Sequence, residues 1–191
     1  MNQPSTTVRG PRLPAEEMRR RVLAGVLRVI ATRGVEGLTH RMVAEAAGVS
    51  LSTTTYYFAT LEDMLVAAMR AEMDLDVAAV RERFAVATPR EIPELLIGYV
   101  VNALRSDTES ATVFAELYVA ALRRDSLRDL VDEWERLWDE LLQPLVGDAA
   151  QAVSAAIGGI VTRGLVLQDR RAPELAAADL RALLAPLLQT E

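Results

Sequence analysis

Apolar residues recur at every third or fourth position along most of the chain, and no segment alternates as a half-buried strand does. Met18, Val22, Val26 and Ile30, for example, are spaced four apart, which places their side chains on one face of an α-helix. Apolar residues make up 51% of the chain, enough for amphipathic helices to bury a sizeable core. The pattern predicts an all-α protein of about nine helices.

Start and stop signals divide the chain into these helices. Thr39 is a good N-cap, Ser50 or Ser52 can cap the short helix that follows, and Thr60 with Asp63 resembles a capping box. Thr88-Pro89-Arg90-Glu91 combines an N-cap, a proline and an acid in the order typical of a helix start. Gly34 and Gly48 are suited to ending helices. The predicted helices are 14–33, 39–47, 51–58, 60–84, 88–105, 106–124, 125–143, 148–168 and 173–189.

The segment 37–58 has the pattern of a helix-turn-helix. Its first helix carries an apolar face with small residues, Ala46 and Ala47, and Gly48 follows in the turn. The second helix is rich in threonine and tyrosine, which are weak helix formers. We expect Thr54 and Phe58, four residues apart, to face the core. We interpret the other side of this helix as a polar surface that contacts DNA phosphates and base edges. A polar surface turn with half-buried tyrosines is the alternative, and it would be preferred for an isolated run of threonines.

Charge is distributed unevenly. The formal net charge is −6, yet the first 60 residues hold eight arginines and four acids, whereas the remainder holds thirteen arginines and twenty-three acids. A basic segment on an acidic body favours nucleic-acid binding at the basic end, although a chance imbalance of a few charges is the alternative. Residues 1–12 have no periodicity, and we expect a disordered basic arm.

Several kinds of site are excluded by composition. The chain has no cysteine and a single histidine, His40, so it lacks thiolate metal sites, multi-histidine metal sites and a nucleophile–base pair. No apolar run is long enough to predict a membrane span. We expect a non-enzyme with no catalytic residue, no metal and no cofactor, and no membrane partner.

The segment of about residues 15–70 resembles the tetracycline-repressor (TetR) family of bacterial regulators. The resemblance rests on Gly37-Leu38-Thr39, Val43–Ser50, Tyr56-Tyr57-Phe58 and Glu62–Leu65. It implies a homodimer that binds double-stranded DNA in the bacterial cytoplasm, with a small-molecule effector of unknown identity. It also implies that DNA is contacted by Thr39, His40, Arg41, Ser50, Ser52, Thr53, Tyr56 and Tyr57. Arg41 is a candidate for reading guanine or, equally, for holding a phosphate.

The sequence departs from the family pattern at two places. Leu61 occupies a position where the family often has a phosphate-binding lysine, so Thr60 is the remaining candidate for that contact. Thr54 and Thr55 stand where an apolar and an aromatic residue are frequent. Both departures put the details of the DNA contacts in doubt.

The larger body carries candidates for an effector pocket and a dimer interface. An apolar pocket would be lined by aromatic and methionine residues, although most such residues at helical spacing belong to the core: Met69, Met73, Phe84, Tyr99, Phe114, Tyr118, Trp134 and Trp138. A helical dimer face, or alternatively a hairpin within one chain, would bury Val153, Ile157, Ile160, Val161, Leu165, Leu180, Leu184 and Leu187.

These features predict three parts: a basic arm at 1–12, a DNA-binding helix-turn-helix domain at 13–60, and an effector-binding and dimerisation domain at 61–191. We interpret the chain as a ligand-responsive regulator, a repressor of a palindromic operator that a largely apolar effector releases. The alternative is a helical interaction or sensor protein of the same fold that binds DNA weakly or not at all.

Overall fold

The computed structural model describes residues 14–88, 90–167 and 171–187, and all regular elements within these ranges are helical. The predicted all-α class is confirmed, whereas the predicted basic arm lies outside the described residues. The elements are α1 Ala15–Arg33, η1 Val35–Gly37, α2 His40–Ala47, α3 Leu51–Tyr57, α4 Leu61–Ala85, α5 Ile92–Arg105, α6 Thr108–Ala121, α7 Asp125–Val146, η2 Gly147–Ala149, α8 Ala150–Leu167 and α9 Ala172–Leu187.

The three predicted caps in the first part of the chain are present. The side-chain oxygens of Thr39, Ser50 and Thr60 accept backbone N–H groups three residues further on, over 3.2, 3.2 and 3.0 Å. Each bond satisfies a helix-end donor that has no partner within its helix. Gly34 and Gly48 end α1 and α2 at φ values of 69° and 65°, which glycine adopts without steric cost.

Several predicted helix boundaries were wrong by two to four residues, and two of them have a clear local cause. The α5 helix begins at Ile92 rather than at residue 88, because Thr88 uses its backbone N–H and its hydroxyl to bind the Glu91 carboxylate over 2.8 and 2.7 Å and closes a separate turn. The α7 helix continues through Pro144 to Val146. An exposed proline in the last turn removes only one backbone hydrogen bond, and the helix ends at Gly147, whose φ is 54°.

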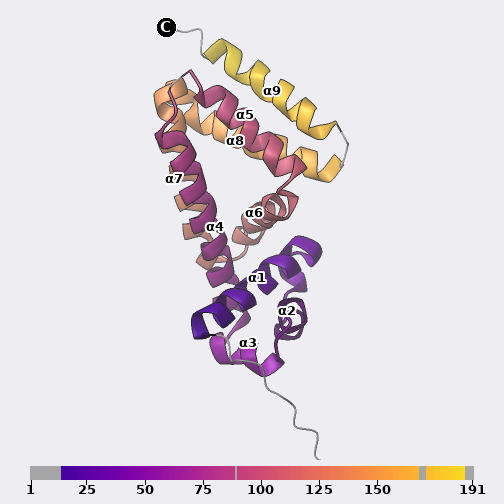
Figure 1. Ribbon diagram of the computed structural model, residues 1–191. Coiled ribbons are helices and arrows are strands. Elements are labelled where there is room, and N and C mark those ends of the chain that lie inside the picture. Colours follow the sequence, from indigo (N-terminus) through magenta and orange to yellow (C-terminus); the bar gives the residue numbers. More distant parts are fainter. Residues whose placement is uncertain (1–13, 89, 168–170, 188–191) are drawn as a thin grey trace, which may run out of the picture.

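The helices form a small head and a longer body (Figure 1). The first three helices gather at one end, and α4 runs from there along α7 toward the other end, where α5, α8 and α9 lie together. The α6 helix packs against α1 and so joins the body to the head. Within the described ranges, apolar residues from every α-helix except α3 are buried in a continuous core, from Val22 in the head to Leu184 in α9.

One close backbone approach fixes the head. A Cβ atom added to Gly25 of α1 would lie 2.8 Å from the Ala47 Cβ, 3.0 Å from the Ala47 nitrogen and 3.1 Å from the Val43 oxygen. No methyl group fits between helices at these separations. The small residues predicted to allow close helix approach in α2 therefore meet a glycine on α1, which the sequence pattern did not single out.

Candidate DNA-binding head and effector site

The head presents a polar surface built from the start of α2 and the outer side of α3. Tyr56 is 82% exposed. The predicted DNA contacts Thr39, Arg41, Ser50, Ser52 and Thr60 are also exposed, whereas His40, Thr53 and Tyr57 are half-buried. On the opposite side of α3, Thr54 is fully buried and Phe58 is 5% exposed, as the sequence predicted. Six of the nine predicted contact residues are therefore open to an approaching DNA surface.

Hydrogen bonds within the head explain one departure from the family pattern. Thr54 stands where an apolar residue is frequent, yet its hydroxyl is not left unsatisfied: it donates to the Leu51 carbonyl over 2.9 Å and lies 3.2 Å from His40 Nδ1. The contact with Thr54 orients the imidazole ring and leaves Nε2 as its other polar atom. His40 is thus a link between α2 and α3 as well as a candidate DNA contact.

Several hydroxyls on this surface already have partners. The Ser50 side-chain oxygen is 2.8 Å from those of both Ser52 and Thr53. Thr60 donates its hydroxyl to the Asp63 carboxylate over 2.7 Å, so a phosphate would have to compete with that carboxylate for the hydroxyl proton. The side chain of Arg41 forms no hydrogen bond or ion pair with another residue in the described part of the chain, and it is exposed. Arg41 is therefore the most available donor of the predicted set.

The body contains a continuous group of aromatic rings. Phe114 stacks on Trp134 at 4.5 Å between ring centroids, and Trp138 meets three further rings edge-on: Trp134 at 5.7 Å, Tyr99 at 5.1 Å and Phe84 at 6.5 Å. We call these five residues the aromatic cluster. Met69 and Met73 are each 2% exposed in the core, and Tyr118, more exposed, bonds to Glu135. Five of the eight predicted pocket residues therefore lie in the aromatic cluster, and Tyr118 lies outside it.

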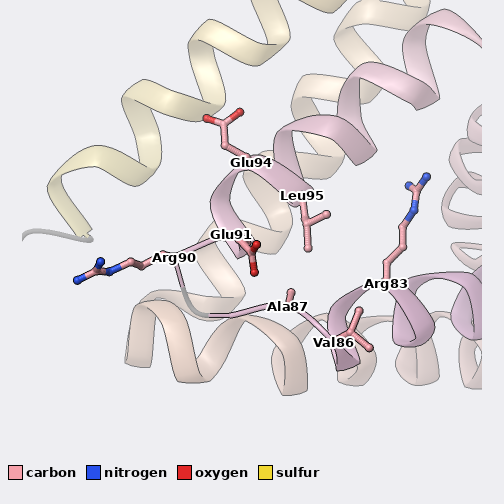
Figure 2. A pocket seen from close by; sticks show the side chains of 7 residues that line it. All are labelled: Arg83, Val86, Ala87, Arg90, Glu91, Glu94 and Leu95. Carbon is pink, nitrogen blue, oxygen red and sulfur yellow. The ribbon is translucent and has the colours of Figure 1, made fainter.

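An open cleft of about 490 Å³ lies between the end of α4 and the start of α5 (Figure 2). None of the predicted pocket residues lines it. A search for aromatic and methionine residues does not find this cleft, because its lining side chains are aliphatic or charged. They belong to Arg83, Val86, Ala87, Arg90, Glu91, Glu94 and Leu95. In Figure 2 the side chains of Leu95 and Glu91 point toward the end of α4. The volume is in the range of small-molecule sites.

Comparison with known proteins identifies the family. The sequence model of the bacterial regulatory proteins of the tetR family matches residues 22–68. The transcriptional regulator BetI of Rhizobium meliloti is 32% identical over 80% of this chain and 81% of its own length. Two solved structures superimpose closely, a TetR-family protein from Streptomyces coelicolor (SCO1917; 34% identity, TM-score 0.73, 88% of this chain and 98% of that one) and EbrR complexed with ethidium (34%, 0.71, 87% and 98%).

The chain belongs to the TetR family. It is a DNA-binding transcriptional regulator and not an enzyme. The predicted regulator function and the resemblance to this family over about residues 15–70 are confirmed. The residues that contact DNA, effector and partner subunit stay predictions.

In this TetR-family chain, only part of the predicted dimer face on α8 and α9 is accessible to a partner subunit. Val153, Ile157, Leu180 and Leu184 are at most 5% exposed within their own chain, so they have almost no surface left to bury against a partner. Ile160, Val161, Leu165 and Leu187 are half-buried and stay candidates. Beside them the structure exposes apolar residues that the sequence interpretation omitted, Val166 at 74% and Leu167 at 61%.

The same apolar surface explains a membrane-like signal. By length and composition alone, the run Asp125–Leu167 is apolar enough to cross a membrane, with 22% of its most apolar stretch buried. The run is not one straight helix, because it is interrupted at Gly147 and η2, and α8 folds back to pack on α7. The exposed apolar side of α8 is the kind of surface that a second subunit covers in a helical dimer.

Side chains from the body hold the turn that precedes α2. Glu116 of α6 accepts the backbone N–H of Val35 over 3.0 Å, and Val35 is 5% exposed. Arg124, between α6 and α7, binds Glu62 at 2.7 Å and Glu36 at 3.5 Å. These contacts connect the body directly to η1 and to the start of α4. They therefore help to set the orientation of the head relative to the body.

We expect Glu116→Ala to lower the free energy of unfolding by about 1–3 kcal/mol, because it leaves a buried backbone donor without a partner. Glu116→Gln is the matched control, since its amide oxygen can still accept from Val35 and the loss should be well below that of alanine. Urea unfolding of the three proteins at equal concentration measures the difference. Equal stability of the alanine variant and the parent protein would show that the Val35 bond does not stabilise the head.

Proposed function

We propose that this TetR-family regulator is a repressor that binds a palindromic operator as a homodimer and leaves it when a small, largely apolar effector binds the body. The proposed parts are a DNA-binding domain at 13–60 and an effector-binding and dimerisation domain at 61–191. The family is one of bacterial regulatory proteins, so we place the protein in the bacterial cytoplasm, where operator DNA is found.

The observation that carries the proposal is the exposed polar surface of the head. Arg41, at the start of α2, is open to solvent beside the outer side of α3, where Tyr56 is 82% exposed. An exposed tyrosine offers both a ring and a hydroxyl to a partner. An arginine that has no partner among the described residues can form two hydrogen bonds with a guanine edge or bind a phosphate. Such a surface on a helix-turn-helix fits the major groove.

Support for an apolar effector comes from the body. The aromatic cluster gives it five rings in contact, and the cleft beside α5 gives a route from solvent. EbrR, which is 34% identical, has been solved with ethidium, a flat and largely apolar molecule. An effector that favours one arrangement of the body would shift the head through the contacts of Glu116 and Arg124.

The test is a gel-shift titration of the purified protein against the DNA that flanks its own gene, with competitor DNA present. We expect a specific complex with a Kd of about 10 nM or tighter. Because arginine–phosphate contacts release counter-ions, affinity should fall by about a hundredfold or more between about 50 and 200 mM salt.

The alternative, an interaction or sensor protein of the same fold, predicts another result. Binding would then be weak and abolished by competitor, and selection from random DNA would yield no preferred sequence. A palindrome recovered from that selection would instead support a regulator whose operator lies away from its own gene.

A further inference from the structure

Arg19 of α1 lies against the end of α3. Its guanidinium carbon is 5.4 Å from the centroid of the Phe58 ring, and Phe58 is the residue that ends α3. Of the five arginines of α1, Arg19 is half-buried and the other four are exposed. Because the face of an aromatic ring attracts a cation, this contact holds the Arg19 side chain beside the turn that joins α3 to α4.

The guanidinium of Arg19 forms no hydrogen bond or ion pair with another residue in the described part of the chain. Its neighbour Arg20, in contrast, binds Glu17 at 2.7 Å. Among the described residues, no buried side-chain nitrogen or oxygen lacks a hydrogen-bond partner. The nitrogens of Arg19 therefore reach solvent, and their N–H groups are available to an acceptor from outside the chain.

The turn itself supplies no charge that could replace or neutralise Arg19. Residues 58–61 are uncharged, and Leu61, the first residue of α4, is 38% exposed. The two acids that follow are engaged elsewhere: Asp63 accepts the Thr60 hydroxyl proton over 2.7 Å, and Glu62 is bound by an arginine of the body at 2.7 Å. Arg19 is therefore an uncompensated positive charge held against this turn.

The turn lies at the edge of the surface that we propose for DNA. Tyr56 on the outer side of α3 is 82% exposed, whereas Phe58 on the inner side is 5% exposed. In Figure 1 the beginning of α1 lies beside α3, at the end of the molecule opposite α9.

The length of α3 indicates which part of DNA this edge would meet. The helix has seven residues and is therefore about 10 Å long, close to the width of the major groove, about 12 Å. A group held at the end of such a helix, on its inner side, meets the phosphates that border the groove rather than the base edges inside it.

We propose that Arg19 binds a backbone phosphate of the operator beside the turn between α3 and α4, and that the Phe58 ring positions its guanidinium for this contact. Guanidinium groups bind phosphate oxygens through short, charge-assisted hydrogen bonds, and a backbone contact carries no base preference. This inference rests on the proposed function and deepens it, because it adds a residue of α1 to the contacts expected from α2 and α3.

The contact has a measurable signature in the salt dependence of binding. Each neutralised phosphate releases counter-ions, so the slope of log affinity against log salt changes by about 0.9 per contact. At about 100 mM salt, one contact of this kind corresponds to about eightfold in affinity. In a homodimer both copies of Arg19 contribute, which gives a slope change of about 1.8 and an affinity change of about 60-fold.

The experiment measures binding of the full chain to fluorescent duplexes by anisotropy, at several salt concentrations between about 50 and 200 mM. One duplex is the operator recovered by selection from random DNA, and the other has a mixed sequence of the same length. The variants are Arg19→Ala and, as the matched control, Arg20→Ala, which removes the neighbouring positive charge of α1. Urea unfolding of each variant establishes that its head is folded.

Two further variants test the place of the contact and the role of the ring. Leu61→Lys in the Arg19→Ala background puts a cation at the start of α4, beside the same turn, and should restore part of the lost slope. Phe58→Leu keeps an apolar side chain in the core but removes the ring. It should lower affinity in the parent protein and leave the Arg19→Ala variant unchanged, whereas a purely structural ring would lower affinity in both.

We expect Arg19→Ala to lose about 60-fold in affinity at about 100 mM salt on both duplexes, with the slope smaller by about 1.8. Arg20→Ala should stay within about threefold of the parent protein. A parent-like slope for Arg19→Ala, a loss confined to the operator, an equal loss for Arg20→Ala, or a Leu61→Lys change that restores nothing would overturn the proposal.

Failure of the proposed function gives a different result. A parent protein that prefers no sequence would contradict the operator-binding repressor. The Arg19 contact does not depend on base sequence, so its slope change would still be measured on the mixed-sequence duplex. Conversely, a parent protein that selects an operator while Arg19→Ala keeps the parent slope would contradict only the contact of Arg19.

Discussion

Gly25→Val is expected to destabilise the head by about 3 kcal/mol or more and to abolish operator binding. The Cβ of the new side chain would meet the Ala47 Cβ at 2.8 Å and backbone atoms of Ala47 and Val43 at 3.0 and 3.1 Å. Backbone cannot swing aside as the tip of a flexible side chain can, so α1 and α2 must separate, and overpacking of this kind typically costs about 1–3 kcal/mol before other losses. Urea unfolding and a gel shift measure the two effects.

Gly98→Val is the matched control. Gly98 is also in the interior of a helix, α5, but no atom lies within 4 Å of its added Cβ, and valine is a slightly better helix former than glycine. Its stability should stay within about 0.5 kcal/mol of the parent protein. A similar loss of stability in both variants would show that the close approach of α1 and α2 is not the reason why residue 25 must be glycine.

Arg41→Ala is expected to weaken specific operator binding by about 1–3 kcal/mol, or roughly 5- to 150-fold. Arg41 is exposed at the start of α2 and has no partner within the described residues, so removing it should leave folding intact. The size of the loss on non-operator DNA separates its two candidate roles. A base contact predicts a loss confined to the operator and relaxed specificity at one position, whereas a phosphate contact predicts similar losses on both DNAs.

Arg20→Ala controls for the loss of one positive charge from the head. Arg20 is exposed on α1, is not among the predicted contacts of α2 and α3, and is paired with Glu17 at 2.7 Å. A surface pair of this kind adds little stability, so affinity for the operator should change by less than about threefold. Operator binding that is unchanged by Arg41→Ala would remove Arg41 from the predicted contacts.

Local chemistry predicted much of the head. Thr39, Ser50 and Thr60 cap helices as expected because an N-cap depends on atoms only three residues apart, and Gly48 ends α2 because its own backbone conformation is left-handed. The polar and apolar sides of α3 were also predicted, with Tyr56 exposed and Thr54 buried. Prediction was poorer at residues 88–92, where a favourable turn between Thr88 and Glu91 replaced the first turn of a helix.

The effector region was less predictable, because spacing alone cannot tell an apolar side chain in the core from one beside a cavity. The sequence marked the rings of the aromatic cluster but not Asp76, which reads as one more acid on an acidic helix. Only the packing of α4 against its neighbours makes that carboxylate half-buried and sets Tyr99 against it. Likewise, Val153 and Leu180 match a dimer face by period, yet both are buried within their own chain.

By itself, the sequence determined the helical class, the helix-turn-helix and its family, because these depend on periodicity, capping residues and a turn glycine within short segments. The tertiary structure decided that α1 and α2 meet without room for a Cβ at Gly25, and that body residues contact the head at Val35 and Glu36. It also decided that the Asp76 carboxylate lies against the Tyr99 hydroxyl. These are relations between residues far apart in the chain, whose distances and burial arise only when the helices pack.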